Sequence, residues 1–412
     1  MLSATAWAAP ADAQPAAASA CETCHRDQAQ AHLAAPARDF AGTDVHRDRG
    51  FSCVDCHGGD AAQPDKARAK AAATGFRGKP AGQTVVAVCA RCHGDAALMR
   101  KYAPKQRVDQ AIEYATSVHG QRLAGGDTKV ATCVSCHGAH GVRLVGDARS
   151  PVYPLNVAAT CTTCHADAER MKGYTRPDGS PLPTDQRARY EKSVHHAAMT
   201  TGNDLSAPTC NDCHGNHGAA PPGVGAVANV CGTCHSVFAT KFALSTHSQI
   251  FDRGCVECHG NHDIAPPTDA MLGTDAAALC STCHSEGDTG HQAATTMRTG
   301  IEALKTAIDR STTLVASAEN AGIDMGDQSL ALREAANHLT LARTEMHAFD
   351  PAPVTTVLQE GLAITGKVDA AGQVALDEVA FRKRGLAVSL GAILLVVVAL
   401  ALKVRRLKAA GR

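Results

Sequence analysis

Apolar side chains recur at helical spacing in the C-terminal third of the chain, over residues 292–384. Two series, one with steps of 4, 3 and 4 residues and one with steps of 3, 4, 3 and 4, are Met297, Ile301, Leu304 and Ile308, and Leu332, Ala335, Leu339, Ala342 and Met346. This spacing puts the apolar side chains of each series on one helix face. Gly322 and Gly326 should separate the two helices, and Asp350 with Pro351 should cap and begin a third. The segment is therefore predicted to form a small antiparallel helical bundle.

The next segment, Leu386–Leu402, is a run of 17 residues without a charge. As a helix it would be about 26 Å long, at the short end of what crosses a bilayer. Three basic residues precede the run and five follow it: Arg382, Lys383 and Arg384, then Lys403, Arg405, Arg406, Lys408 and Arg412. A buried helix of a soluble protein would not carry such flanks, and the excess beyond the run favours a cytoplasmic C-terminus. We therefore expect a transmembrane helix at 385–403 and a cytoplasmic basic tail at 404–412.

The chain before residue 290 carries all 18 cysteines, and every one belongs to a Cys-x-x-Cys-His motif. The first cysteines of the nine motifs are Cys21, Cys53, Cys89, Cys133, Cys161, Cys210, Cys231, Cys255 and Cys280. The second cysteines are Cys24, Cys56, Cys92, Cys136, Cys164, Cys213, Cys234, Cys258 and Cys283. The motif histidines are His25, His57, His93, His137, His165, His214, His235, His259 and His284. This motif is typical of covalent attachment of haem c, in which two thiols add to the haem vinyl groups and the histidine becomes the proximal ligand of the iron.

Zinc sites and disulfides are the alternative interpretations of paired cysteines. Neither requires a histidine directly after the second cysteine, so nine such motifs out of nine favour haem. The composition agrees, because only 3% of the residues are aromatic and the motif region is rich in Gly, Ala and Pro. Side chains of this kind could not build a large core, and nine haems would supply the missing apolar surface. Basic and acidic residues both number 40, so nothing indicates nucleic-acid binding.

The motifs alternate between two types. A first-type motif follows a small apolar run, as in VAVCARCH from Val86. A second-type motif is preceded by Ser-x-His and followed by a further histidine, as in CHGNH ending at His217, whereas the first copy has Asp60 in place of that histidine. The chain is thus predicted to contain four two-haem modules and a half module, near 18–60, 86–140, 158–217, 228–262 and 277–291. Repetition of this kind indicates a linear array of like units.

The combination of Ser-x-His and Cys-x-x-Cys-His-Gly-x-His resembles the paired-CXXCH, cytochrome c3-like multihaem cytochromes over about residues 18–291. The resemblance implies bis-histidine haems in close contact and a role in anaerobic or metal-linked respiratory electron transfer. The tail, residues 291–412, is similar to that of membrane-bound members. The expected fold is mostly α and irregular: a nonahaem cytochrome domain organised around its haems, then the helical bundle and one C-terminal transmembrane helix.

Each low-spin electron-transfer haem needs a second axial ligand. The repeats select histidines from the leading and trailing positions, and two further histidines each lie seven residues after a motif histidine. These nine candidates are His46, His119, His195 and His247, then His140, His217 and His262, then His32 and His291. They match nine irons, and no methionine recurs at a repeat position, so we expect bis-histidine ligation throughout. His196 could replace His195.

One histidine of the helical tail, His347, stays open between three interpretations. It could ligate the last haem, belong to a quinol site, or be a helix-end histidine favoured by the helix dipole.

The function expected from an array of haem pairs is electron transfer rather than catalysis. Because covalent haem attachment takes place outside the bacterial cytoplasmic membrane, the haem domain should lie in the periplasm, between the membrane quinone pool or a membrane redox subunit and periplasmic redox proteins. Residues 1–17 are either a signal-peptide remnant or a flexible leader. The alternatives are a quinol dehydrogenase in its own right, and a reductase of nitrite, hydroxylamine or a sulfur oxyanion. A single apolar helix without intramembrane His or acid offers little for quinol chemistry, and nine regular motifs with nine available histidines give no sign of an open iron.

Overall fold

The computed structural model describes residues 19–176, 178–222 and 227–410. The leader expected at 1–17 lies outside these residues. In the described part the chain is helical and irregular, and the only β-pairing is an isolated bridge between Thr175 and Pro181. The chain divides into two compact units, Met1–Gly223 with Gly260–Pro266, and Val224–His259 with Pro267–Arg412. Six of the nine motifs lie in unit 1 and three in unit 2.

Unit 1 is built from short helices. They are α1 (Ala20–Arg26), α2 (Ala31–Thr43), α3 (Cys53–His57), α4 (Lys66–Ala69), α5 (Gln83–His93), α6 (Ala96–Tyr102), α7 (Gln110–Thr116), α8 (Val118–Ala124), α9 (Cys133–His137), α10 (Pro154–His165), α11 (Ala168–Met171), α12 (Gln186–Tyr190), α13 (Val194–Thr200) and α14 (Cys210–His214), with the 3-10 turns η1 (Arg47–Arg49) and η2 (Ala72–Thr74). Helices this short are marginal by themselves in water. Their positions therefore depend on caps and on the groups packed between them.

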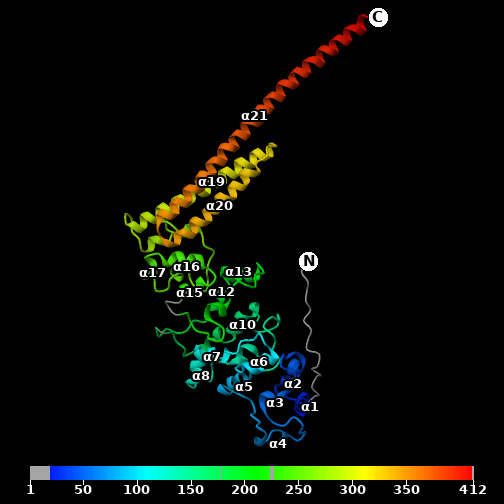
Figure 1. Ribbon diagram of the computed structural model, residues 1–412, viewed down its shortest axis with the longest axis vertical. Coiled ribbons are helices and arrows are strands. Elements are labelled where there is room, and N and C mark those ends of the chain that lie inside the picture. The colour runs from blue at the N-terminus through cyan, green and yellow to red at the C-terminus, as the bar shows by residue number, and fades with distance from the viewer. Residues whose placement is uncertain (1–18, 177, 223–226, 411–412) are drawn as a thin grey trace. The chain divides into compact units, whose positions relative to one another are not determined.

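Unit 2 begins with short helices and ends in long ones (Figure 1). They are α15 (Val227–Gly232), α16 (Ser236–Ala243), α17 (His247–Ile250), α18 (Val256–His259), η4 (Asp269–Met271), η5 (Cys280–Thr282), α19 (Thr289–Asn320), α20 (Gly326–Glu345), η6 (Met346–Ala348) and α21 (Pro351–Ala410). The last three motifs thus share a compact unit with the tail helices.

Helices α19, α20 and the first half of α21 lie side by side as the predicted bundle (Figure 1). Met297, Ile301 and Leu304 are at most 1% exposed, and they pack with Leu339 and Leu358 in one core cluster. α19 ends at Asn320, and Gly322 follows with a φ of 89°. The helical periodicities and the break between the first two helices are confirmed.

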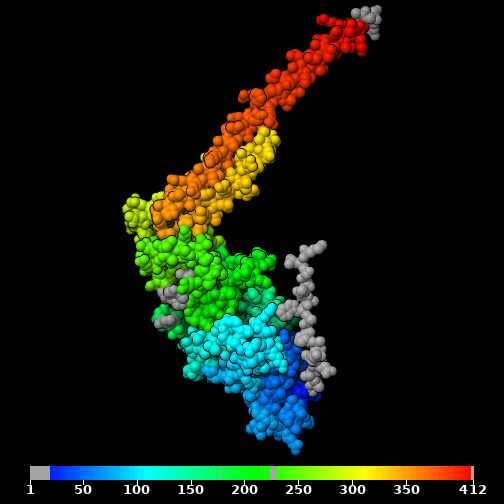
Figure 2. Space-filling model, in the orientation of Figure 1, coloured from blue at the N-terminus to red at the C-terminus, as the bar shows by residue number. Residues whose placement is uncertain are grey.

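Helix α21 continues without interruption from the bundle through the apolar run Leu386–Leu402. The most apolar stretch of this helix has a mean hydropathy of 2.8, and none of it is buried against the rest of the chain (Figure 2). Exposed leucine, isoleucine and valine side chains on all sides of a helix are typical of a segment surrounded by lipid. The chain therefore has one C-terminal helix fit for single-pass membrane anchoring.

Candidate haem-binding sites

Two of the first-type motifs occupy the last turns of helices. In α5 and α10 the apolar run forms the preceding turns, and the motif histidine is the last helical residue, His93 in one and His165 in the other. In these two helices the apolar run before the cysteines therefore presents the motif. α1 differs, because it begins at Ala20, directly before Cys21, with Ser19 as N-cap accepting from the backbone N–H of Glu22.

The second-type motifs form one-turn helices of their own, α3, α9 and α14. The residue before the first cysteine caps each helix, and the side chain three residues later accepts from the N–H of that cap. The three pairs are Ser52 with Asp55 at 2.7 Å, Thr132 with Ser135 at 3.0 Å, and Thr209 with Asp212 at 2.8 Å. After the motif histidine the chain turns away through a glycine with positive φ, at Gly58, Gly138 and Gly215. The CHG sequence is therefore a helix stop, because glycine adopts this conformation without strain.

The leading Ser-x-His sequence is also a cap. Ser117 and Ser193 are buried, and each hydroxyl accepts from the backbone N–H at the start of its helix, Gly120 in α8 and His196 in α13. Each hydroxyl also donates to a tyrosine carbonyl three residues earlier, at 2.6 Å. The leading histidine is held in the first turn of a capped helix.

Thiols of the two motifs in a module lie next to each other. All 18 cysteines are free, and hydrogen bonds join the first cysteines of paired motifs: Cys89 with Cys133, Cys161 with Cys210, and Cys231 with Cys255. In a c-type cytochrome these sulfur atoms would be thioethers to haem. These contacts join the two motifs of the predicted modules near 86–140, 158–217 and 228–262.

Four motif histidines have a second imidazole stacked opposite them. The ring-centre distances are 6.0 Å for His57 with His140, 6.1 Å for His137 with His217, 6.0 Å for His214 with His262 and 6.3 Å for His259 with His347. The ring planes of all four pairs are within 15° of parallel. The second histidine of each pair comes from beyond the module that carries the motif.

Three more motif histidines face a leading histidine of the preceding module at a steeper angle. The ring-centre distances are 6.1 Å for His93 with His46, 6.1 Å for His165 with His119 and 6.0 Å for His284 with His247. Successive modules therefore exchange histidines. The leading histidine of a module faces a motif histidine of the next module, and its trailing histidine faces a motif histidine of the preceding module.

These separations fit one metal ion between each pair of rings. A metal–imidazole nitrogen bond is about 2 Å long and the ring centre lies roughly 1 Å beyond the nitrogen, so two imidazoles on opposite sides of one metal have centres about 6 Å apart. Direct stacking of two rings would bring them closer together. The side chains of this chain thus fit an iron bound between two histidines, which is the ligand set of a low-spin haem.

Backbone and carboxylate acceptors orient several of the rings. Nδ1 of His57 donates to the carbonyl of Gly78 at 2.8 Å, and Nδ1 of His347 donates to that of Arg343 at 3.1 Å. A donor bond from Nδ1 leaves Nε2 unprotonated and available to a metal. Burial lowers the pKa of many of the paired histidines, which favours this neutral form: His93, His119, His137, His140, His165, His247, His259, His262 and His347.

A repeated backbone hydrogen bond joins the two exchanged histidines. The N–H of the residue before a leading histidine donates to the carbonyl two residues after a trailing histidine: Val45 to Val142 at 2.9 Å, Val118 to Ala219 at 3.1 Å, and Val194 to Ile264 at 2.8 Å. One short bridge therefore sets the positions of two of the predicted axial ligands, one on each side of the module boundary.

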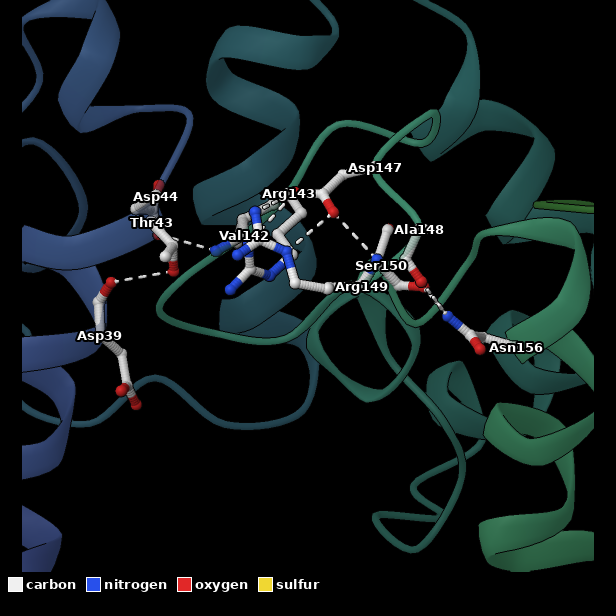
Figure 3. Close-up of polar contacts among 10 residues, drawn as sticks. All are labelled: Asp39, Thr43, Asp44, Val142, Arg143, Asp147, Ala148, Arg149, Ser150 and Asn156. Atoms are coloured by element: carbon white, nitrogen blue, oxygen red, sulfur yellow. Dashed lines mark hydrogen bonds and ion pairs between the residues drawn. The ribbon is translucent and has the colours of Figure 1, made fainter.

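The first of these bridges is reinforced by the buried carboxylate of Asp44 (Figure 3). It accepts from the backbone N–H of His46 and of Val142, at 2.9 and 3.0 Å, and from Nδ1 of His46 at 2.9 Å. Burial raises the pKa of Asp44, but the hydrogen bonds from His46 and Val142 outweigh it, so the pKa lies below its usual value. Asp44 is a charged partner of His46, a predicted ligand, and an anchor for the loop that carries His140.

Further polar contacts hold the loop after His140 in place (Figure 3). Asp147 accepts from Arg143 at 3.1 Å and from Arg149 at 3.0 Å, and the side-chain amide of Asn156 donates to the carbonyls of Ala148 and Ser150, both at 2.8 Å. Asn156 belongs to α10, so these contacts connect the loop after His140 to the helix of the next first-type motif.

His347 occupies the trailing position for the motif at Cys255. Phe349, two residues later, packs its ring on His247 at 4.2 Å, at the place in the chain where the earlier modules use the backbone bridge. Phe238 meets His347 edge-on at 5.0 Å, and the adjacent Glu345 pairs with Lys241 of α16 at 2.8 Å. The helix-end interpretation of His347 is therefore incomplete, since its ring faces His259. The repeat itself was the sequence signal for His347, because the motif at Cys255 needs a trailing histidine from beyond His262.

Some predicted ligands are placed elsewhere. His32 is exposed. His291 lies in the first turn of α19, and its backbone N–H donates to the side chain of Asp288 at 2.7 Å. In the described part of the chain neither ring contacts a motif histidine, and His284 faces His247 instead. His195 stands in the same place after its capping serine as His119 does, whereas the ring of His196 packs on Tyr190 at 5.3 Å. This arrangement favours His195 over His196.

Comparison with known families agrees with this geometry. Residues 45–166 match the model of the cytochrome c3 family, and residues 247–289 match that of the doubled CXXCH motif. No protein of curated function and no solved structure shows significant similarity to the chain. The chain is a multihaem c-type cytochrome, and so an electron-transfer protein. Within that class it is similar to cytochrome c3 and to proteins with the doubled CXXCH motif over these two stretches, and it also has a C-terminal helix apolar enough to cross a membrane.

Proposed function

We propose that this cytochrome carries nine covalently bound haems and transfers electrons between the membrane quinone pool, or a membrane redox subunit, and periplasmic acceptors. The observation that carries the proposal is the set of seven histidine pairs with ring centres 6.0–6.3 Å apart. When bound, each haem supplies a one-electron ferric/ferrous couple. At the seven paired motifs the chain's own residues would hold two imidazoles for one iron.

The proposed ligand sets follow the pairs. The leading histidines His46, His119 and His247 serve the irons of His93, His165 and His284. The trailing histidines His140, His217 and His262, followed by His347, serve those of His57, His137, His214 and His259. Seven motifs at which two histidines would hold one iron favour electron transfer over the reductase and quinol-dehydrogenase alternatives.

The number of haems is the first test. Intact mass spectrometry of the denatured protein should show nine haem additions, because thioether bonds survive unfolding. A mass with five haems or fewer, or with metal and no haem, would remove the basis of the proposal.

The motif at Cys280 is the proposed exchange point on the membrane side. Cys280 packs against the core cluster of the bundle, and Asp288, the N-cap of α19, lies 3.2 Å from Nδ1 of His284. Helix α21 of this bundle continues into the membrane anchor. The Cys280 motif is therefore connected, through the bundle, to the segment expected to enter the bilayer. With the haem domain in the periplasm, the basic tail 404–412 would be cytoplasmic.

Replacing Cys280 and Cys283 by alanine tests this assignment. The variant should carry eight haems and lose their reduction by a quinol-driven membrane partner, while reduction by dithionite remains. The matched control is the Cys21→Ala, Cys24→Ala variant, which should also carry eight haems but keep quinol-driven reduction. Quinol-driven reduction at the original rate in the Cys280 variant would place the entry point elsewhere.

A further inference from the structure

The first motif differs from the seven paired ones in what lies opposite its histidine. In the described part of the chain the ring of His25 has no second imidazole facing it. Lys70 is there instead: its Nζ atom lies 3.4 Å from Nε2 of His25.

The orientation of His25 shows that Lys70 is on the iron side of the ring. Nδ1 of His25 donates to the carbonyl of Leu33 at 3.1 Å, so the unprotonated nitrogen that binds iron is Nε2. His32 directly precedes Leu33, whose carbonyl lies on the opposite, Nδ1 side of the ring. His32 is exposed as well. The spacing of seven residues made His32 a candidate, but the group beside Nε2 of His25 is the amine of Lys70.

The loop that carries Lys70 is fixed to the first two motifs by backbone hydrogen bonds. Ala20 at the start of α1 donates to the carbonyl of Ala61 at 3.0 Å, and Asp60 donates to that of Ala69 at 3.0 Å. Gly59 has a φ of 92°, and a Cβ atom there would lie 2.7 Å from the Ala69 carbonyl oxygen. Glycine after His57 therefore allows this close approach, which sets Lys70 at the end of α4.

The 3.4 Å between Nζ of Lys70 and Nε2 of His25 is close to the separation of two nitrogen ligands of one metal. Two metal–nitrogen bonds of about 2 Å in line put the donor atoms roughly 4 Å apart, so a shift of about half an ångström at the end of a flexible side chain suffices. The stem of Lys70 lies near the ring of Phe76, with Nζ 5.5 Å from the ring centre. An amine that binds a metal does so in its neutral form, as a single-point donor on a long stem.

We propose that Lys70 is the second axial ligand of the haem at Cys21, so that this haem has one histidine and one lysine ligand. The inference rests on the haem attachment proposed above for Cys21–His25. It replaces the expectation that His32 fills this position, and it gives the first haem a ligand field different from that of the seven bis-histidine sites.

The test uses the full chain in detergent, with three alanine variants compared to the wild type. Lys70→Ala should keep nine haems by mass but gain one high-spin ferric haem per chain in the electron paramagnetic resonance spectrum. Its reduced form should bind one carbon monoxide. Lys66→Ala, one helical turn earlier in the same exposed helix, is the matched control and should stay low-spin, as should His32→Ala. Lys70→His should restore the low-spin state.

A measurement on the wild type keeps the test independent of how the variants fold. Near-infrared magnetic circular dichroism should resolve one histidine–amine haem beside the bis-histidine ones. A high-spin signal from His32→Ala, an unchanged spectrum in Lys70→Ala, or carbon monoxide binding by the wild type would each overturn the proposal. A mass of eight haems with the Cys21 peptide unmodified would instead contradict the attachment on which it rests.

Discussion

Unit 1 and the helical bundle of unit 2 bury different kinds of side chain. Among the described residues, the largest fully buried side chains of the bundle include Met297, Ile301 and Leu304, whereas those of unit 1 are the serines Ser117, Ser150 and Ser193. The bundle is stabilised by burial of apolar side chains, as an ordinary helical domain is. In unit 1, Ser117 and Ser193 are helix caps, the buried apolar side chains such as Leu123 and Met199 are scattered, and haem would supply much of the apolar surface. One chain thus combines a fold that its own side chains stabilise with one that depends on its cofactors.

The largest effect should come from preventing haem attachment. If the chain is produced without the cytochrome c maturation system, unit 1 should lack protected amides because its short helices cannot persist alone. α19 and α20 should remain helical, since their core contains no cofactor. Hydrogen exchange read by mass spectrometry separates the two regions. Equal protection of α10 with and without haem would contradict the comparison.

A cavity in the bundle should lower its free energy of unfolding, because its core is built from packed apolar side chains. Leu304 is 0% exposed, and its methyl groups lie over Gly361, where an added Cβ would come within 2.8 Å of them. Leu304→Ala should cost roughly 2–5 kcal/mol of unfolding free energy for the bundle, measured by denaturant titration of the helical signal. The haem absorption spectrum should not change. Leu330→Ala on the exposed side of α20, where Leu330 is 59% exposed, should stay within about 0.5 kcal/mol.

The sequence predicted the two regions with different success for physical reasons. Helical periodicity is local, so the positions of α19, α20 and the anchor could be read directly from the chain. The haem motifs are equally local, because both sulfur atoms and the proximal histidine lie within five residues. Distal ligands are not: His140 is 83 residues from His57, and only the repeated exchange between modules relates them. After the last module the motifs stop, so the repeat rule could not find His347, and the sequence selected His291 instead. For the first motif a spacing of seven residues selected His32, whereas the structure places Lys70 beside His25.

The bundle is not fully independent of the cofactors if His347 is a ligand. His347→Ala should convert one of nine low-spin haems to high-spin, because its ring is the one facing His259 at 6.3 Å. The electron paramagnetic resonance spectrum of the oxidised protein measures this change. His338→Ala is the matched control on α20, since His338 is half-buried beside Glu360 at 3.6 Å and far in sequence from any motif. An all-low-spin spectrum for His347→Ala would separate the bundle from the haem array.

The smallest expected effect concerns a charge in unit 1 that touches no haem. Asp44 accepts from Nδ1 of His46, and a carboxylate in this position increases the electron density that the imidazole gives to iron, which favours the ferric state. Asp44→Asn keeps the shape of the side chain and an acceptor oxygen but removes the charge, so the potential of the His93 haem should rise. A tenfold change in relative ligand affinity corresponds to about 59 mV for one electron, and loss of one carboxylate should give less than this. Spectroelectrochemical titration against the exposed control Asp48→Asn measures the shift. A potential unchanged in Asp44→Asn would mean that Asp44 acts only as an anchor for the loop after His140, through its bond to Val142.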